Sequence, residues 1–120
     1  MKVKVEAIVN GMEALAELAR KELKVPTAYK VARLIKACNA ELQTYNEQRI
    51  SILKSLGCEQ DESGANYIIP EGKKGEFAQK YMELISTEVE IPAEKIDLSG
   101  ETAPIAPGLL LTLEDFITLE

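Results

Sequence analysis

The sequence predicts an α+β fold, mainly helical, with one long central helix. The stretch from Thr27 to Gly57 contains no proline, and it has no glycine before its last residue. Apolar residues recur along it every three or four positions, as on one face of a helix. Short segments near both termini instead alternate apolar and charged residues, which is typical of strands. At this length we expect a single domain over residues 1–120, with the long helix in a helical hairpin and a small β-sheet formed by short strands near the termini.

The N-terminal segment predicts a strand followed by a helix. Lysine and valine alternate over residues 2–5, which suits a short edge strand with its lysines facing outward. A helix is then expected from Gly11 to about Lys24. Asn10 and Glu13 have the spacing of a capping box at its start, and Pro26 follows its end.

The long helix has a signal at each end. Thr27 is a suitable N-cap, and Gly57 is a suitable C-terminal stop. A helix of about 29 residues between them is about 45 Å long, which exceeds the usual width of so small a domain. Its expected apolar seam consists of Val31, Ile35, Cys38, Leu42, Tyr45, Arg49, Ile52 and Leu56, with Leu34 and Leu53 beside it.

The second half predicts shorter elements. A brief strand is expected at residues 67–69 and a third helix at about 73–86. Two short strands, or one strand broken by Pro92, follow around Val89–Ile91 and Ile96–Leu98. Pro107 suits the first position of a C-terminal helix. We expect the first and third helices to lie end to end along the apolar stripe of the long helix and to cover most of it.

Composition argues against most hydrolases. The chain has no histidine, which removes the commonest general base and metal ligand. It carries no phosphate loop, dinucleotide fingerprint or metal-ligand spacing, so no cofactor is expected. Cys38 and Cys58 are interpreted as buried thiols rather than a disulfide, which fits a reducing compartment. Neither a signal peptide nor a membrane span is indicated, and cytoplasmic synthesis is expected.

The charge is unevenly divided along the chain. The formal net charge is −6, but residues 1–58 carry ten Lys or Arg against six acids, whereas residues 59–120 carry four against fourteen. The halves are therefore +4 and −10. Complementary packing of the two halves, two separately solvated faces, and a partner that recognises the acidic half all fit this division. Lys30, Arg33 and Lys36 form a modest basic stripe, but the net negative charge argues against a nucleic acid partner.

Two groups of residues are candidates for a ligand or partner site. The first is the polar waist of the long helix, which comprises Tyr45, Glu47, Gln48 and Arg49. If Arg49 is buried it needs an acidic partner, with Glu83 and Glu88 as candidates, because an unpaired buried charge costs several kcal/mol. A polar layer that fixes helix register is the alternative. The second group is Lys73 and Lys74 in a glycine-containing segment at a helix start, where an anion would be attracted.

The order of these segments resembles a family of small uncharacterised proteins encoded by phages and prophages of Gram-positive bacteria. The resemblance is carried by "TAYKVARLIKACNAELQTYNEQR", by "SLG" before an acidic loop, by "EFAQKYMELISTEVEI" and by "APGLLLTLEDFI". Together these segments span most of the chain. Ala106 departs from the Ser or Thr expected before the proline, and Gly108 follows it. The resemblance implies a phage context, in the host cytoplasm or the virion, and no mechanism.

These observations lead to two expectations about function. The first is a non-catalytic, phage-encoded interaction protein, a virion or assembly component that acts through a protein partner or self-association as an oligomer. The long seam, the charge division and the absence of a catalytic group set support it. The alternative is a small-ligand or nucleotide-binding protein that uses the polar waist or the two lysines.

Overall fold

The computed structural model describes residues 1–64 and 66–119. The helices are α1 (Val5–Ala19), α2 (Val25–Ser55), α3 (Lys74–Ile85) and α4 (Pro107–Thr112), with a short 3-10 turn η1 (Glu71–Lys73) before α3. The strands are β1 (Lys2–Lys4), β2 (Glu59–Gln60), β3 (Tyr67–Ile68), β4 (Glu88–Glu90), β5 (Ile96–Asp97) and β6 (Ile117–Thr118). The expected mainly helical α+β fold with a long helix following a shorter one is confirmed.

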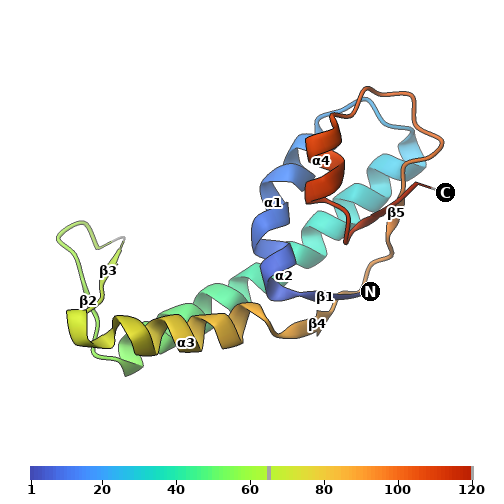
Figure 1. Cartoon of the computed structure of the whole chain (residues 1–120). Helices are drawn as coiled ribbons and strands as arrows, with labels where there is room; N and C mark the ends of the chain where they lie inside the picture. Colours follow the sequence, from blue (N-terminus) through green and yellow to red (C-terminus); the bar gives the residue numbers. More distant parts are fainter. Residues whose placement is uncertain (65, 120) are drawn as a thin grey trace.

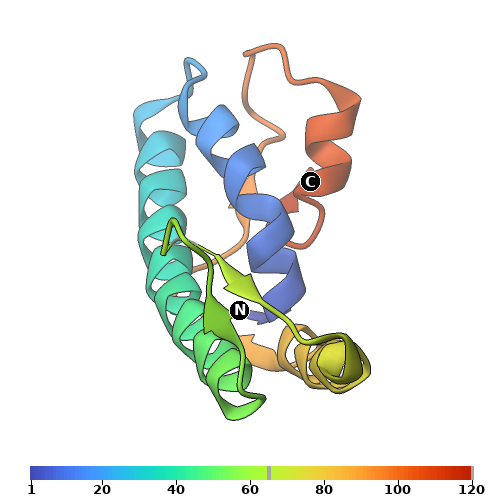
Figure 2. The ribbon, with the colours of Figure 1, turned by 90° about the vertical axis from the view of Figure 1, so that its left-hand side faces the viewer.

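The long helix α2 joins two parts of different thickness (Figure 1). Its first half belongs to a body made of residues 1–40 and 87–119, in which α1 lies between α2 and α4 (Figure 2). Its second half leaves the body and pairs with α3, which returns alongside it; residues 41–86 form this arm (Figure 1). The molecule measures 52 × 28 × 23 Å along its principal axes. α1 and α3 thus contact successive parts of α2, as the apolar seam predicts.

The seam of α2 divides between two apolar clusters. In the body, α1, α2, α4 and the strands enclose a large core, whose fully buried members include Leu15, Leu18, Leu34, Ile96, Leu113 and Phe116. In the arm, a small cluster forms around the buried Leu53, Leu56 and Cys58. Both cysteines are buried free thiols, as expected. Every predicted seam residue of α2 is buried or half-buried.

The short strands form three separate ladders rather than one sheet. β1 pairs with β4 antiparallel, so that Lys2 lies opposite Glu90 and Lys4 opposite Glu88, and both lysines face solvent. β5 and β6 pair in parallel, also within the body. β2 and β3 form an antiparallel hairpin at the end of the arm, which we call the tip hairpin. The predicted pairing of short strands near the termini is confirmed, and it takes the form of two separate ladders, β1–β4 and β5–β6.

The first helix begins six residues earlier than predicted. Asn10 is an exposed residue inside α1, so it caps nothing. Lys4 precedes the helix without a side-chain cap. The N–H of Val5 instead donates to the carbonyl oxygen of Thr87 at 2.9 Å, across the β1–β4 ladder. A carbonyl distant in sequence therefore satisfies one of the free N–H groups of the first turn.

The start of α2 also differs from the prediction, whereas its end does not. Pro26 lies in the first turn of α2, where its missing N–H is harmless, and Thr27 follows inside the helix. The N–H of Lys24 donates to a carboxylate oxygen of Glu101 at 2.9 Å. At the other end Gly57 has a φ of +76°, the left-handed conformation in which glycine ends a helix.

The C-terminal helix is shorter than its leucine pattern indicates. Pro107 is in the first turn of α4, as predicted, but the helix ends at Thr112. The chain then turns, and Phe116 and Thr118 accept hydrogen bonds from the N–H groups of Ile96 and Leu98, both at 2.9 Å. Pairing with β5 thus draws the last residues into β6.

Candidate functional site

The polar waist does not gather its four residues at one place. Tyr45 and Arg49 are half-buried on the seam side of α2, whereas Glu47 and Gln48 are exposed on other faces of the helix. This follows from the helical period, because adjacent residues point about 100° apart. Only Tyr45 and Arg49 therefore face the second helix of the arm.

Tyr45 has a partner on α3 that sequence reasoning missed. Its hydroxyl lies 2.7 Å from the hydroxyl of Tyr81, and the two rings meet edge to face with centroids 6.2 Å apart. Tyr81 in turn stacks on Phe77 at 5.6 Å. Tyr81 is on the predicted apolar stripe of α3, but the sequence does not specify the register between the two helices. These aromatic contacts therefore connect the two helices of the arm, beside the apolar cluster of Leu53, Leu56 and Cys58.

The surroundings of Tyr45 shift the pKa of its phenol. Burial, followed by the hydrogen bond to Tyr81, raises the pKa of Tyr45 to about 12, while the positive charge of Arg49 acts in the opposite direction. The phenol of Tyr45 is thus neutral at physiological pH and is not poised to act as a base.

Arg49 does not have the acidic partner that burial would require. Its side chain is half-buried, and among the residues that the structure describes no carboxylate forms an ion pair with it. Glu88 lies in β4 opposite Lys4, and Glu83 is an exposed residue of α3. Because water reaches the guanidinium, the predicted pairing with either glutamate is unnecessary.

Lys73 and Lys74 lie at the other end of α3 from the body. Each contacts an acid one helical turn away: Lys73 lies 3.5 Å from Glu76, and Lys74 lies 2.8 Å from Glu71. These are exposed pairs along the helix, and such pairs contribute little to stability. The six candidate residues of the sequence therefore fall into two places and do not line one cavity.

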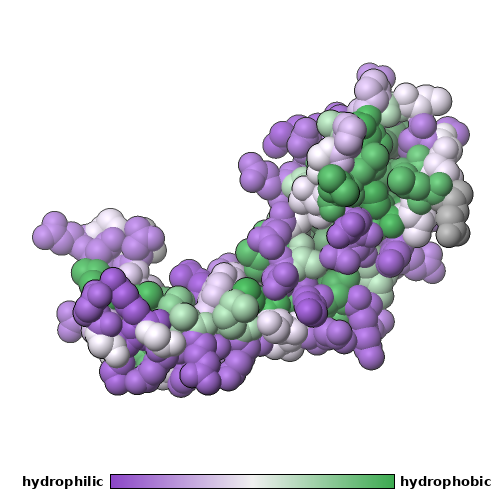
Figure 3. Space-filling model, viewed as in Figure 1, coloured by the Kyte–Doolittle hydropathy of each residue, from purple (hydrophilic) through white to green (hydrophobic). Residues whose placement is uncertain are grey.

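A more apolar surface lies on the body, where sequence reasoning placed no site. A shallow hollow of about 530 Å³ runs between α4 and β6, lined mainly by Pro107, Leu110, Leu111, Ile117 and Leu119. Leu111 and Leu119 are 69% and 60% exposed. Figure 3 shows apolar residues gathered over α4 and the C-terminal strand, whereas the lower edge of the arm is polar. The only signal in the sequence is three consecutive leucines, of which the body buries only one fully.

Within the described residues, no three His, Cys, Asp or Glu side chains are grouped so that they could hold a metal ion. No helix in that part of the chain is long and apolar enough to cross a membrane. No protein-family model matches the sequence, and neither the curated proteins nor the solved structures contain a significant match to it.

Proposed function

We propose that this chain is a non-catalytic interaction protein that works by protein–protein contacts, as a component of a larger assembly. One observation carries the proposal. The chain exposes 7791 Å², whereas a compact monomer of 13.2 kDa exposes about 6,400 Å². The excess of about 1,400 Å² is in the range that one subunit of a stable homodimer buries.

The arm accounts for the open shape. α3 has no fully buried residue, although Phe77, Tyr81 and Leu84 lie on its apolar stripe. A two-helix layer covers each helix on one side only, and folded domains normally add a second layer. The elongated hairpin is a shape suited to contact with another chain.

The phage particle is the proposed setting, and its support is the sequence resemblance alone. The small-ligand alternative has less support. Tyr45 already bonds to Tyr81, Glu47 and Gln48 face solvent, and the lysines pair with their own neighbours. None of these groups is left as an unpaired, buried recognition group of the kind that ligand pockets contain.

Light scattering over a concentration series tests the proposal. We expect the molar mass to rise above that of one chain, to that of a dimer or a larger closed oligomer. A constant mass of one chain up to millimolar concentration would contradict it, since the excess surface would then remain exposed to water.

A further inference from the structure

The last strand of the body has one edge without a neighbouring strand. Among the described residues β6 pairs only with β5, and β5 in turn contacts α2. β6 is therefore the outer strand of this ladder. An edge of this kind presents backbone N–H and C=O groups to which a further strand can add.

The main chain of Ile117 faces this edge. The carbonyl oxygens on either side of it, those of Phe116 and Thr118, accept hydrogen bonds from N–H groups in and next to β5, both at 2.9 Å. In a parallel ladder the residue between two such acceptors directs its own N–H and C=O groups to the opposite side.

These two groups of Ile117 have no hydrogen-bond partner within residues 1–64 and 66–119, although the residue is only 7% exposed. Buried backbone groups are nearly always paired, so the edge lacks the donor and the acceptor that would complete it.

The apolar hollow lies beside this strand. One side of it is formed by residues 117–119, which span about 10 Å of extended chain. The other side is formed by α4 and the turn after it, including Leu110 and Leu111. Three turns of an α-helix would already be about 16 Å long. The hollow therefore suits an extended segment of three or four residues better than a helix.

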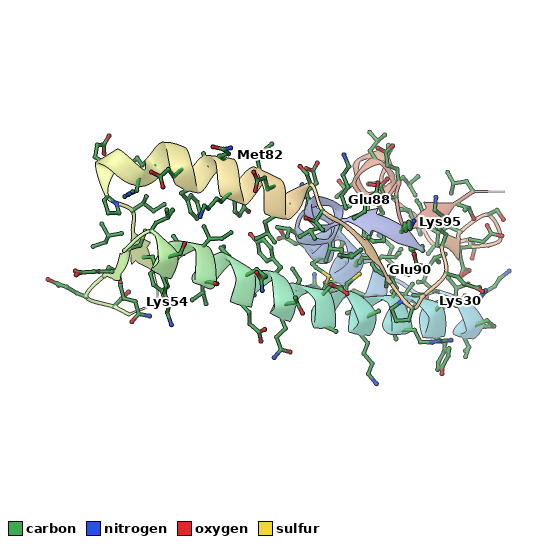
Figure 4. All side chains as sticks on the ribbon, turned by 90° about the horizontal axis from the view of Figure 1, so that it is seen from below. Lys30, Lys54, Met82, Glu88, Glu90 and Lys95 are labelled. Carbon is green, nitrogen blue, oxygen red and sulfur yellow. The ribbon has the colours of Figure 1, made fainter. Side chains whose placement is uncertain are left out.

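Negative charge predominates at the border of the hollow. Among the described residues that line it, Glu114 alone is charged. An adjoining polar hollow shares Leu111 and Glu114 with it, and its charged lining residues are two lysines and four acids: Lys2, Lys4, Glu6, Glu88, Glu114 and Asp115. Each lysine lies opposite a glutamate of β4, and Figure 4 shows these glutamates, Glu88 and Glu90, beside β1. The acids of this border are therefore in excess.

We propose that this edge binds an extended segment of a partner protein, which adds to β6 as a third strand. Its apolar side chains, at alternate positions, fill the hollow beside α4, and Lys or Arg residues at one end meet Glu114 and Asp115. Its main chain supplies the hydrogen-bond partners that Ile117 lacks. The inference rests on the proposed function, because it names the surface and the chemistry of one partner.

The border charges favour a basic partner over a second copy of the chain. Two copies joined at this edge would bring the same carboxylates to both sides of the contact, and like charges across an interface are unfavourable. Residues 59–120, which include α4 and β6, carry a net charge of −10. A basic segment neutralises part of this charge, so the acids select the partner and the hollow provides apolar burial.

A synthetic peptide tests the binding. The probe is a fluorescein-labelled peptide in which valine and threonine alternate and three lysines follow. Two control peptides replace the valines by serine or the lysines by glutamate. Fluorescence anisotropy with the full chain should show saturable binding of the probe. The dissociation constant should be roughly tenfold larger for each control peptide, because each lacks one of the two recognised features.

Two variants of the chain test the surface. Leu111 is 69% exposed and Glu114 is also exposed, so neither change should unfold the body, and circular dichroism checks this. Leu111→Ser should weaken binding of the probe by roughly tenfold, and Glu114→Lys by roughly fivefold. Glu114→Lys should also bind the glutamate peptide more tightly than the native chain does. Met82→Ser is the matched control, since Met82 is an exposed apolar residue on α3 of the arm (Figure 4), and binding should not change.

The backbone amide of Ile117 reports strand addition directly. With saturating probe, its hydrogen exchange measured by NMR should slow by roughly tenfold or more, because the N–H then donates to the peptide. Amides of the tip hairpin, which lies at the end of the arm, should exchange at their native rate and serve as the control.

The outcomes separate this inference from the function on which it rests. Saturable binding that both variants weaken, with protection of Ile117, supports the third strand. Absence of binding at millimolar probe, equal binding of the glutamate peptide or an unprotected Ile117 overturns it. An oligomer that does not bind the probe leaves the interaction protein standing. If Leu111→Ser instead abolishes the native oligomer, a second copy occupies the hollow, and the basic partner is overturned.

Discussion

Gly11 is the residue where backbone preference and packing oppose each other most clearly. It lies inside α1 against the fully buried ring of Phe116, and a Cβ at that position would be 3.0 Å from its Cε2 atom. The absent side chain thus allows α1 to approach the residue that leads into β6. Sequence reasoning took this glycine only as the start of the helix, because Phe116 is more than a hundred positions away.

We expect Gly11→Ala to lower the free energy of unfolding by up to about 2 kcal/mol. Overpacking costs about 1–3 kcal/mol, and the better helix propensity of alanine offsets only about 1 kcal/mol of it. The matched control is Gly75→Ala in the exposed first turn of α3, where a Cβ would meet nothing within 4 Å. That change should be neutral or stabilising. Urea denaturation of both variants measures this, and equal stabilisation by the two would refute the packing argument.

Tyr45 makes the free energy of unfolding depend on pH in the alkaline range. Its pKa of about 12 in the folded chain lies above the usual value of 10, so the folded state holds the phenolic proton more tightly than the unfolded state does. The resulting stabilisation is complete below about pH 10 and is lost as the pH rises toward about 12. Tyr45→Phe should therefore flatten the dependence of unfolding free energy on pH in this window.

Burial also raises the pKa of Cys38 to about 11, which adds a loss of stability between about pH 9 and 11. The measurement therefore compares how steeply the free energy of unfolding falls with pH in each variant. Denaturant unfolding from about pH 9 to 11.5 is followed for native and Tyr45→Phe chains. Tyr29→Phe is the control, since Tyr29 is 66% exposed. If both variants keep the native slope, the tyrosine pair does not carry the effect.

For the helices and strands, the sequence correctly predicted the features that are determined by residues close to each other in the chain. The length of α2 follows from a long stretch without breakers that ends at Gly57, and all predicted seam residues face neighbouring elements. The starts of α1 and α2 are instead determined by residues distant in sequence. The carbonyl of Thr87 accepts from the first turn of α1, and Glu101 accepts from the start of α2, so neither start carries a capping motif in its own sequence.

The candidate site could likewise be predicted only in the features that depend on residues close in sequence. The period of α2 correctly placed Tyr45 and Arg49 on the seam, yet it could not identify Tyr81 as the partner, because the register of α3 is a tertiary property. The hollow between α4 and β6 exists only because residues 117–118 pair with β5. A run of leucines alone does not reveal which side chains will remain exposed.

The arm should open more easily than the body. α3 has no fully buried residue, and the arm cluster is much smaller than the body core. Regions with few buried apolar contacts open at lower free energy than the global unfolding of the chain. We expect backbone amides of α3 to exchange with deuterium faster than those of α1.

Phe77→Ala should widen this difference, because the ring packs against the arm cluster and stacks on Tyr81. Exchange in α3 and the tip hairpin should accelerate while α1 is unchanged. Leu15→Ala, in the body core, is the comparison and should accelerate exchange throughout. Uniform acceleration by Phe77→Ala, measured by mass spectrometry, would mean that arm and body unfold as one unit.

At the scale of the whole molecule, shape and charge act together. The radius of gyration is 17.1 Å, against about 14 Å for a compact domain of this length. The formal charge is divided along the chain, with +4 on residues 1–58 and −10 on residues 59–120. An extended molecule with its charge divided in this way allows long-range electrostatic forces to steer a partner of complementary charge.

We therefore expect association to weaken with salt. The Debye length falls from about 10 Å at 0.1 M to about 3 Å at 1 M, so exposed charges on two chains then interact weakly with each other. Sedimentation equilibrium at both concentrations should show a larger dissociation constant at high salt. Association that strengthens instead would identify an apolar contact, such as the hollow beside α4, as the dominant surface.

The path of the chain through the molecule has a further consequence. It leaves the body once, along α2, and returns once, along α3, while residues 1–40 and 87–119 complete the body without help from the tip. Removing seven residues from each helix would shorten the arm by about 10 Å and rotate its faces by only about 20°. The reach of the molecule is therefore a separately adjustable dimension, a spacer whose length can change over evolution or by engineering while the folded base stays the same.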